Sequence, residues 1–142
     1  MVVNLDILSL FFNQCNYMYF DNELPVPEFG ILHSFRTCGF FQYIKGGWFD
    51  KTLYDPILSM TDYYDFTEEQ FVDIMCHEMV HYYLAYIGED RDCSHGKKFK
   101  KMADQLNRTF GLHITPHLDL SKYKRRKGTP SLSYWFVKQL YV

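Results

Sequence analysis

The stretch from residue 67 to residue 88 reads TEEQFVDIMCHEMVHYYLAYIG, and the rest of the chain is organised around it. Thr67 and Gln70 have the spacing of a capping box, which begins a helix, and Gly88 is the usual kind of residue after a helix end. Between these ends, apolar residues recur at helical spacing. We therefore predict a helix from Thr67 to about Ile87 that packs against the remainder of the fold.

Inside this helix lies His77-Glu78-Met79-Val80-His81, an HExxH motif. Two histidines four residues apart project from one helix face, so both can bind one metal ion with Glu78 beside them. We expect these three side chains on the face toward the predicted sheet. Hydrolytic zinc takes three protein ligands and leaves one position open. The motif thus predicts Zn²⁺ at His77 and His81, with Glu78 as the base that accepts a proton from a metal-activated water.

The third ligand must come from outside the motif. His95 begins a second predicted helix, which runs to about Phe110 and is closed by Gly111, and a helix hairpin would bring it back beside the first. Asp92 or Ser94 can cap that helix. The competing ligands are acidic residues of the loop between the helices: Glu89, Asp90 and Asp92. We favour His95.

The alternative for the motif is two ordinary helical histidines, one in the core and one at the surface. The combination of Glu78 and His95 with the motif favours a metal site. Surface or loop roles are predicted for the remaining histidines: His33, His113 and His117. The last two are four residues apart, but Pro116 between them disfavours a regular helix.

Upstream of the motif, the pattern predicts one helix followed by a small, mostly antiparallel sheet. Asn4 or Asp6 can cap the helix, which should end before residue 21. Gly46-Gly47 is a candidate hairpin turn. Alternating apolar residues predict strands over residues 29–35, 39–44, 48–53 and 57–60, and a terminal strand over residues 133–142. The fold class is therefore α+β.

One domain over residues 1–142 fits this length, with a core of about residues 4–112 and a basic and aromatic extension of about residues 113–142. Four scattered cysteines without a CxxC pair predict reduced thiols in a cytoplasmic protein. No apolar stretch is long enough for a membrane span, and residues 1–20 lack the basic start of a signal peptide. Nothing in the sequence specifies an oligomeric state.

Charge is distributed unevenly. Residues 1–95 carry 15 acidic and 4 basic side chains, whereas residues 96–142 carry 2 acidic and 11 basic ones. The basic segment consists of Lys122, Lys124, Arg125, Arg126 and Lys127, and aromatic residues 134–136 follow it. Such charges can bind phosphates and such rings can stack on bases, which makes DNA a candidate partner. The alternative is a solvated basic loop before a buried aromatic strand.

Several segments of the chain form a pattern beyond the motif: YFDNELP at residues 19–25, CGFF at 38–41, ILS at 57–59, the HExxH motif, and His95-Gly96 with Phe99. Together these segments resemble the Spartan-related SprT-like zinc metalloprotease family. The resemblance covers roughly residues 14–110 and implies a compact zincin-like fold. It also implies zinc bound by His77, His81 and His95, with Glu78 as the catalytic base and a polypeptide as the substrate. Many relatives end in a cysteine-rich zinc ribbon, and some use it to engage DNA. Here no cysteine follows Cys93.

Three functions share this metal. The first is a zinc endopeptidase, for which cleavage of DNA-linked proteins is the family expectation. The second is a zinc-containing module that binds nucleic acid or protein with little or no proteolysis. In the third, zinc serves only to stabilise the fold and has no open coordination position.

Overall fold

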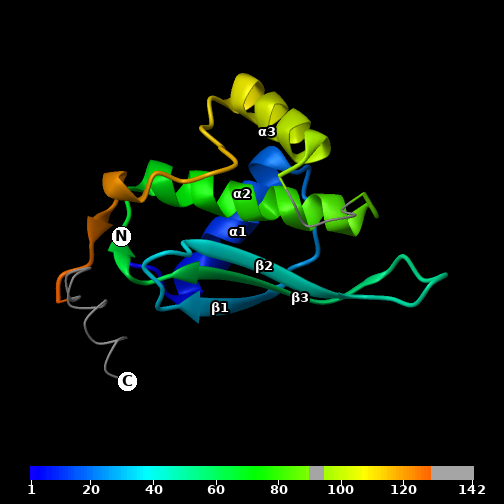
Figure 1. Ribbon diagram of the computed structural model, residues 1–142, viewed down its shortest axis with the longest axis horizontal. Coiled ribbons are helices and arrows are strands. Elements are labelled where there is room, and N and C mark those ends of the chain that lie inside the picture. Colours follow the sequence, from blue (N-terminus) through cyan, green and yellow to red (C-terminus); the bar gives the residue numbers. More distant parts are fainter. Residues whose placement is uncertain (90–94, 129–142) are drawn as a thin grey trace.

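The computed structural model describes residues 1–89 and 95–128. In these residues, α1 and α2 cover one face of a small sheet, and α3 lies on the other side of α2 (Figure 1). The elements in chain order are α1 (Leu5–Tyr19), β1 (Glu28–Leu32), β2 (Gly39–Lys45), β3 (Leu53–Thr61), β4 (Tyr64–Asp65), α2 (Glu68–Tyr86), α3 (Lys97–Phe110), the 3-10 turn η1 (Leu120–Lys122) and β5 (Lys124–Arg125). The α+β class predicted from the sequence is confirmed.

The main sheet has three strands in the order β1-β3-β2, and a second sheet pairs β4 with β5. Two of the three pairings are antiparallel, while β1 runs parallel to β3. The predicted strands 48–53 and 57–60 are in fact replaced by one strand, β3, that begins at Leu53. Pro56 obscured this continuity in the sequence. It is tolerated because β1 pairs with β3 only from Ile57 onward and the register with β2 shifts opposite Pro56, between Gln42 and Ile44, so no regular ladder hydrogen bond is needed there.

The first helix begins and ends where local chemistry dictates. The Asn4 side chain accepts a 2.8 Å hydrogen bond from the Ile7 N–H, as a cap should. At the other end, Asp21 and Asn22 adopt positive φ angles of 52° and 57°, which turns the chain out of the helix. The buried Asn16 then bonds both the N–H and the carbonyl of Leu24, which fixes the loop that leads to β1.

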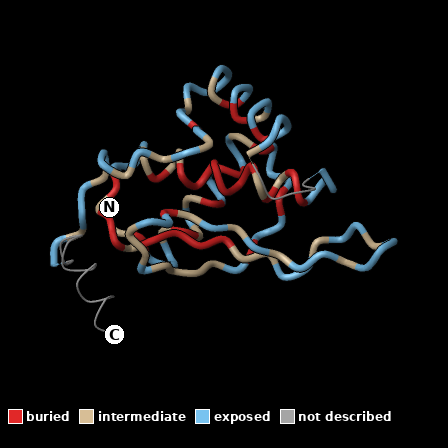
Figure 2. Tube along the Cα trace, viewed as in Figure 1, coloured by how far each residue is buried: buried red, intermediate tan, exposed pale blue. Residues whose placement is uncertain are grey.

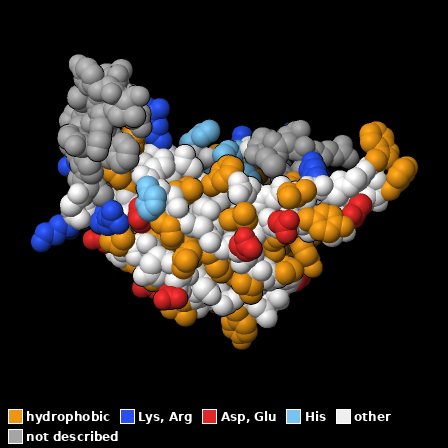
Figure 3. All heavy atoms as spheres, turned by 90° about the horizontal axis from the view of Figure 1, so that it is seen from below, with side chains coloured by type: hydrophobic (Ala, Val, Ile, Leu, Met, Phe, Trp, Pro, Cys, Tyr) orange, Lys and Arg blue, Asp and Glu red, His pale blue; other side chains and the backbone are white. Residues whose placement is uncertain are grey.

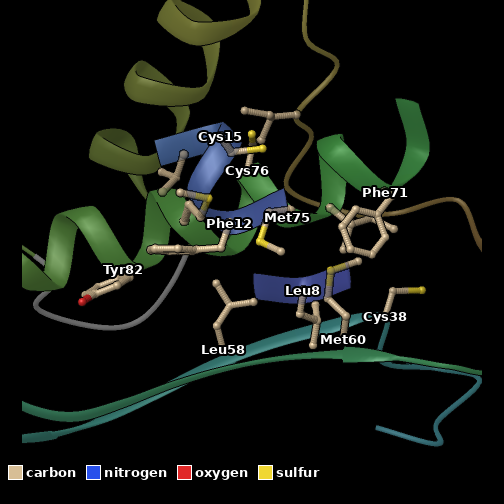
Figure 4. Close-up of a cluster of buried hydrophobic side chains, with 14 of the residues drawn as sticks. Leu8, Phe12, Cys15, Cys38, Leu58, Met60, Phe71, Met75, Cys76 and Tyr82 are labelled. Carbon is tan, nitrogen blue, oxygen red and sulfur yellow. The ribbon is translucent and has the colours of Figure 1, made fainter. Parts of the chain in front are cut away.

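The core lies between the two inner helices and β3 (Figure 4). It is built from fully buried side chains, among them Leu8 and Phe12 of α1, Met75 of α2, and Leu58 and Met60 of β3. Figure 2 shows that buried residues run along most of α2 and the end of β3. Burial on several sides holds α2 in place, so side chains on this helix occupy defined positions.

The motif helix has the predicted ends. The Thr67 side chain accepts from the Gln70 N–H, and the Gln70 side chain accepts from the Thr67 N–H, which completes the capping box. Ile87 is the C-cap, and Gly88 follows with a φ of 74° that an L side chain rarely adopts.

The second predicted helix begins later than expected. It starts at Lys97 with Gly96 as its N-cap, so the proposal that Asp92 or Ser94 caps it is wrong. Gly96 has no side chain to cap the helix, and its extended backbone leaves His95 outside the helix, free to turn toward α2. The helix ends at Gly111 with a φ of 71°, as predicted.

The predicted terminal strand 133–142 lies outside the described residues. Among the residues that are described, no helix combines the length and apolar character needed to cross a bilayer.

Candidate metal centre

Three imidazole rings meet between α2 and α3. His77 and His81 lie one turn apart on α2, and their ring centroids are 5.1 Å apart. The His95 ring lies 4.9 Å from the first and 5.0 Å from the second. Its Nε2 atom is 3.1 Å from Nε2 of His77 and 3.2 Å from Nε2 of His81. The fold therefore brings together the three histidines selected from the sequence, in a cluster that can hold a metal ion.

Two of the three nitrogen spacings are close to those of one shared cation. Nitrogens that bind zinc tetrahedrally at about 2.0–2.1 Å lie about 3.3 Å apart, and the His95 nitrogen is 3.1 and 3.2 Å from the other two. Hydrogen bonding alone does not explain the arrangement, since one proton on His95 Nε2 can serve only one of its two neighbours. A cation at the centre would be held by one nitrogen from each of the three rings.

A main-chain carbonyl selects the tautomer of His77. The Nδ1 atom of His77 lies 2.8 Å from the carbonyl oxygen of Thr115. Because a carbonyl only accepts, Nδ1 must carry the proton, which leaves the Nε2 lone pair available toward the other two rings. A hydrogen bond of this kind is the usual outer support of a metal-binding histidine.

The surroundings favour the uncharged form of two of the rings, those of His77 and His95. Burial, with a smaller effect from neighbouring His81, lowers the pKa of His77 to about 4. Burial and the nearby His117 and Lys100 also lower the pKa of His95. Neutral imidazole is the form that binds a metal, so these two histidines are in the correct state at pH 7.

Glu78 points in a different direction from the histidines. A Cβ atom on Gly39, the first residue of β2, would lie 2.9 Å from Glu78 Cγ and 3.0 Å from its Oε1. The histidine rings instead contact Phe99 of α3. Our expectation that all three motif side chains face the sheet is therefore wrong for the histidines. Consecutive residues are about 100° apart around a helix, so Glu78 need not share their face.

The Glu78 carboxylate nevertheless stays close to the cluster. Its Oε1 is 3.9 Å from Nε2 of His77, and the residue is only 7% exposed. Burial raises the pKa of Glu78 to about 8. The shift brings the pKa of this carboxyl group toward neutral pH, where a general acid or base can both accept and release a proton.

Phe99 packs against the three rings. Its ring lies 4.9 Å from His77, 4.7 Å from His81 and 4.9 Å from His95, and the residue is 1% exposed. Because Phe99 sits on the first turns of α3, it ties the position of that helix to the geometry of the cluster.

Two features of the site could not be found from the sequence. One is the Thr115 carbonyl, because every residue carries a carbonyl and no side-chain pattern marks this one. The other is His117, whose exposed ring lies 5.7 Å from that of His95. The chain returns to the site because the Asn107 side chain bonds both the N–H and the carbonyl of Ile114. The surface or loop position predicted for His117 is correct, but the sequence did not predict that its ring lies beside that of His95.

The other histidines lie apart from the cluster. His113 Nδ1 is 3.9 Å from Asp73 Oδ2, and its side chain is largely exposed. His33 Nδ1 is 2.9 Å from Asp62 Oδ1 and is exposed as well. Both have the surface roles predicted for them.

The basic segment lies beside β4 and the start of α2, and none of its residues belongs to the histidine cluster. It comprises Lys122, Lys124, Arg125, Arg126 and Lys127. Arg126 is partly buried, with its guanidinium 3.3 Å from Asp62, so it attaches the segment to the body of the fold. The other four are exposed. The aromatic residues 134–136 that follow lie outside the described residues.

Comparison with known proteins agrees with this geometry. The model of the SprT-like family matches residues 8–118. The DNA-dependent metalloprotease SPRTN of Homo sapiens is 30% identical over 125 residues, which are 83% of this chain and 24% of that protein. The chain thus spans about a quarter of the length of this relative. The matched region contains α2, His95 and the whole histidine cluster. On these grounds the chain belongs to the SprT-like family.

Proposed function

We propose that this protein is a zinc-dependent metallopeptidase that hydrolyses peptide bonds in polypeptides. The observation that carries the proposal is the convergence of three imidazole nitrogens with a buried carboxylate 3.9 Å from one of them. Membership of the SprT-like family supports the same activity. Three histidine ligands with one open position are the usual donor set of hydrolytic zinc, which is why we propose Zn²⁺ as the metal.

In the proposed reaction, the metal and Glu78 have different roles. A zinc ion held by His77, His81 and His95 would acidify a water molecule and polarise the scissile carbonyl. Glu78 accepts the proton of the attacking water and delivers it to the departing amine. The hydrogen bond from His77 to Thr115 keeps the ligand ring in the required tautomer throughout.

The substrate would lie along β2. This strand is at an edge of the three-stranded sheet, and its first residue, Gly39, packs against Glu78. An extended polypeptide can add to such an edge through main-chain hydrogen bonds, which places its backbone beside the carboxylate. Binding through the backbone suits cleavage of many different sequences.

Gly39 leaves the space that Glu78 needs. We expect Gly39→Ala to displace Glu78 and to lower kcat by about 100-fold, because small misplacements of a catalytic group have effects of that size. Zinc content should not change, since no histidine of the cluster lies among the atoms nearest to this position. Steady-state kinetics and metal analysis would test this. The matched control is Gly47→Ala, where nothing lies within 4 Å, and equal activity of the two variants would contradict the assignment.

We further propose that DNA stimulates cleavage by this chain, and the name of the relative SPRTN, a DNA-dependent metalloprotease, supports the proposal. The exposed charges of Lys122, Lys124, Arg125 and Lys127 favour phosphate contacts. They also favour the second candidate function, a zinc-containing DNA-binding module without proteolysis. A cytoplasmic location fits the free, buried thiols of the described cysteines: Cys15, Cys38 and Cys76.

A cleavage assay on an unfolded protein, with and without single-stranded DNA, tests the function. We expect cleavage that a chelator abolishes and Zn²⁺ restores, with a higher rate when DNA is present. Cleavage that is insensitive to chelation would refute the metallopeptidase. DNA binding that weakens with salt, without cleavage under any condition, would favour the binding module.

A further inference from the structure

The hairpin between β2 and β3 extends beyond the body of the molecule and ends in two exposed aromatic residues (Figure 1). Trp48 is 93% exposed and Phe49 is 95% exposed. Figure 3 shows hydrophobic side chains at the end of this projection. Adjacent large aromatic rings that are almost fully exposed are unusual on a protein surface, and such exposed apolar groups often mark a site that binds another molecule.

The apolar surface continues down the hairpin. Ile44 and Tyr54 face each other across the β2–β3 ladder, and both are about half exposed. Together with the tip they form an apolar strip, which we define as Ile44, Trp48, Phe49 and Tyr54. The strip follows the direction of β2 away from the metal centre.

Hydrogen bonds hold the tip in shape. The Gly46 N–H donates to the Thr52 carbonyl, and the Asp50 N–H donates to the Gly47 carbonyl. The Asp50 carboxylate accepts from both the Thr52 N–H and the Tyr54 hydroxyl. Because the turn is already ordered, it loses little conformational entropy when a ligand binds to its aromatic rings, and this favours affinity.

The charges around the strip fit a polypeptide better than a nucleic acid. Lys45 and Lys51 are balanced by Asp50 and Asp55. Acidic side chains are scattered over the neighbouring face of the sheet (Figure 3). Single-stranded nucleic acid binds to stacking rings that are accompanied by an excess of positive charge, and this surface has no such excess. An apolar strip with balanced charges around it instead suits the hydrophobic side chains of an extended polypeptide.

The location of the strip connects it to the proposed active site. β2 begins at Gly39 beside Glu78 and leads directly into the tip. Suppose that a substrate pairs with β2 and that its scissile bond lies beside Glu78. At about 3.3 Å per residue, the substrate residue that reaches Trp48 is about eight to ten positions from that bond. A substrate bound along β2 would therefore arrive at these rings.

We propose that Trp48 and Phe49 form an exosite that binds hydrophobic side chains of an unfolded polypeptide substrate, about eight to ten residues from the scissile bond. The inference rests on the proposed function, because it assumes that the substrate lies along β2. It would make the enzyme selective for unfolded proteins, since folded proteins bury such side chains.

Binding can be measured without cleavage in the Glu78→Gln protein. The probes are a 24-residue peptide with a Phe-Leu-Phe cluster about nine positions from its centre, the same peptide with Ser in place of the cluster, and an eight-residue peptide. We expect Trp48→Ser/Phe49→Ser to weaken binding of the first peptide by about 10-fold or more, as loss of buried aromatic anchors does. Binding of the other two should change less than about 2-fold. Tyr17→Ser/Met18→Ser, which alters exposed residues on α1, is the matched control and should bind like the parent.

Tryptophan fluorescence gives a second readout. The chain has two tryptophans, Trp48 and Trp135, so Trp135→Phe leaves the tip residue as the sole probe. Its emission should shift to shorter wavelength when the first peptide binds, and should not shift with the Ser version. Unchanged melting of Trp48→Ser/Phe49→Ser would show that the loss of binding does not come from unfolding.

Three results would overturn the exosite. The first is equal affinity of Trp48→Ser/Phe49→Ser and its parent for the first peptide. The second is loss of affinity for single-stranded DNA but not for peptide, and the third is a change of oligomeric state without a change in peptide binding. A wild type that cleaves nothing, with tip-dependent peptide binding intact, would refute the peptidase while supporting the exosite.

Discussion

Glu78→Gln is expected to reduce peptide cleavage by about 1000-fold while zinc stays bound, because general-base catalysis contributes about 10²- to 10⁴-fold. Glutamine has nearly the same shape as glutamate, so the packing against Gly39 persists. The amide cannot take a proton from water. Because this variant changes none of the proposed metal ligands, we expect the three histidines to keep their positions and the protein to keep its affinity for zinc.

Cleavage rates with a fluorescent unfolded substrate, measured together with zinc content per chain, test this expectation. The matched control is Glu89→Gln, which makes the same chemical change at an exposed carboxylate 3.7 Å from Lys98. Full activity of Glu78→Gln would contradict the proposed mechanism. Loss of zinc from this variant would instead assign Glu78 to metal binding.

His95→Ala is expected to have an effect of similar size through a different route. It removes one of three nitrogens that converge within 4.8 Å, so zinc affinity should fall by more than about 100-fold, since even loss of an outer supporting hydrogen bond costs about 10- to 100-fold. Cleavage should be lost with the metal. The variant should also melt at a lower temperature in the presence of zinc than the parent does, because bound metal no longer stabilises the folded state.

Competition with a chromophoric chelator measures the affinity, and thermal melting with and without zinc measures the stabilisation. His113→Ala is the control, because His113 lies apart from the cluster beside Asp73. Unchanged zinc affinity in His95→Ala would show that another residue is the third ligand. Among the acidic competitors, Glu89 pairs with Lys98 in the structure, and Asp90 and Asp92 lie outside the described residues.

Local signals were sufficient for both ends of the motif helix and for the end of α3, but they did not locate the start of α3. The capping box of Thr67 and Gln70 and the glycines after the motif helix and α3 act within a few residues, so their effect can be read directly from the order of residues. The strands were harder to predict. Pro56 has no N–H to donate, so its position in the sequence suggested a break between two strands. Whether the missing hydrogen bond ends a strand depends on the pairing with neighbouring strands, which only the assembled sheet defines.

The sequence by itself selected the first residues of a candidate metal site, because the helix alone places the two histidines of an HExxH motif on one face. Only the tertiary structure decided how that site is completed. It brought His95 within 3.2 Å of both motif histidines, directed Glu78 toward Gly39, and supplied the Thr115 carbonyl. It also carried β2 from the site to the exposed rings of the hairpin. These relations join residues far apart along the chain, and their distances depend on how the helices and the sheet pack.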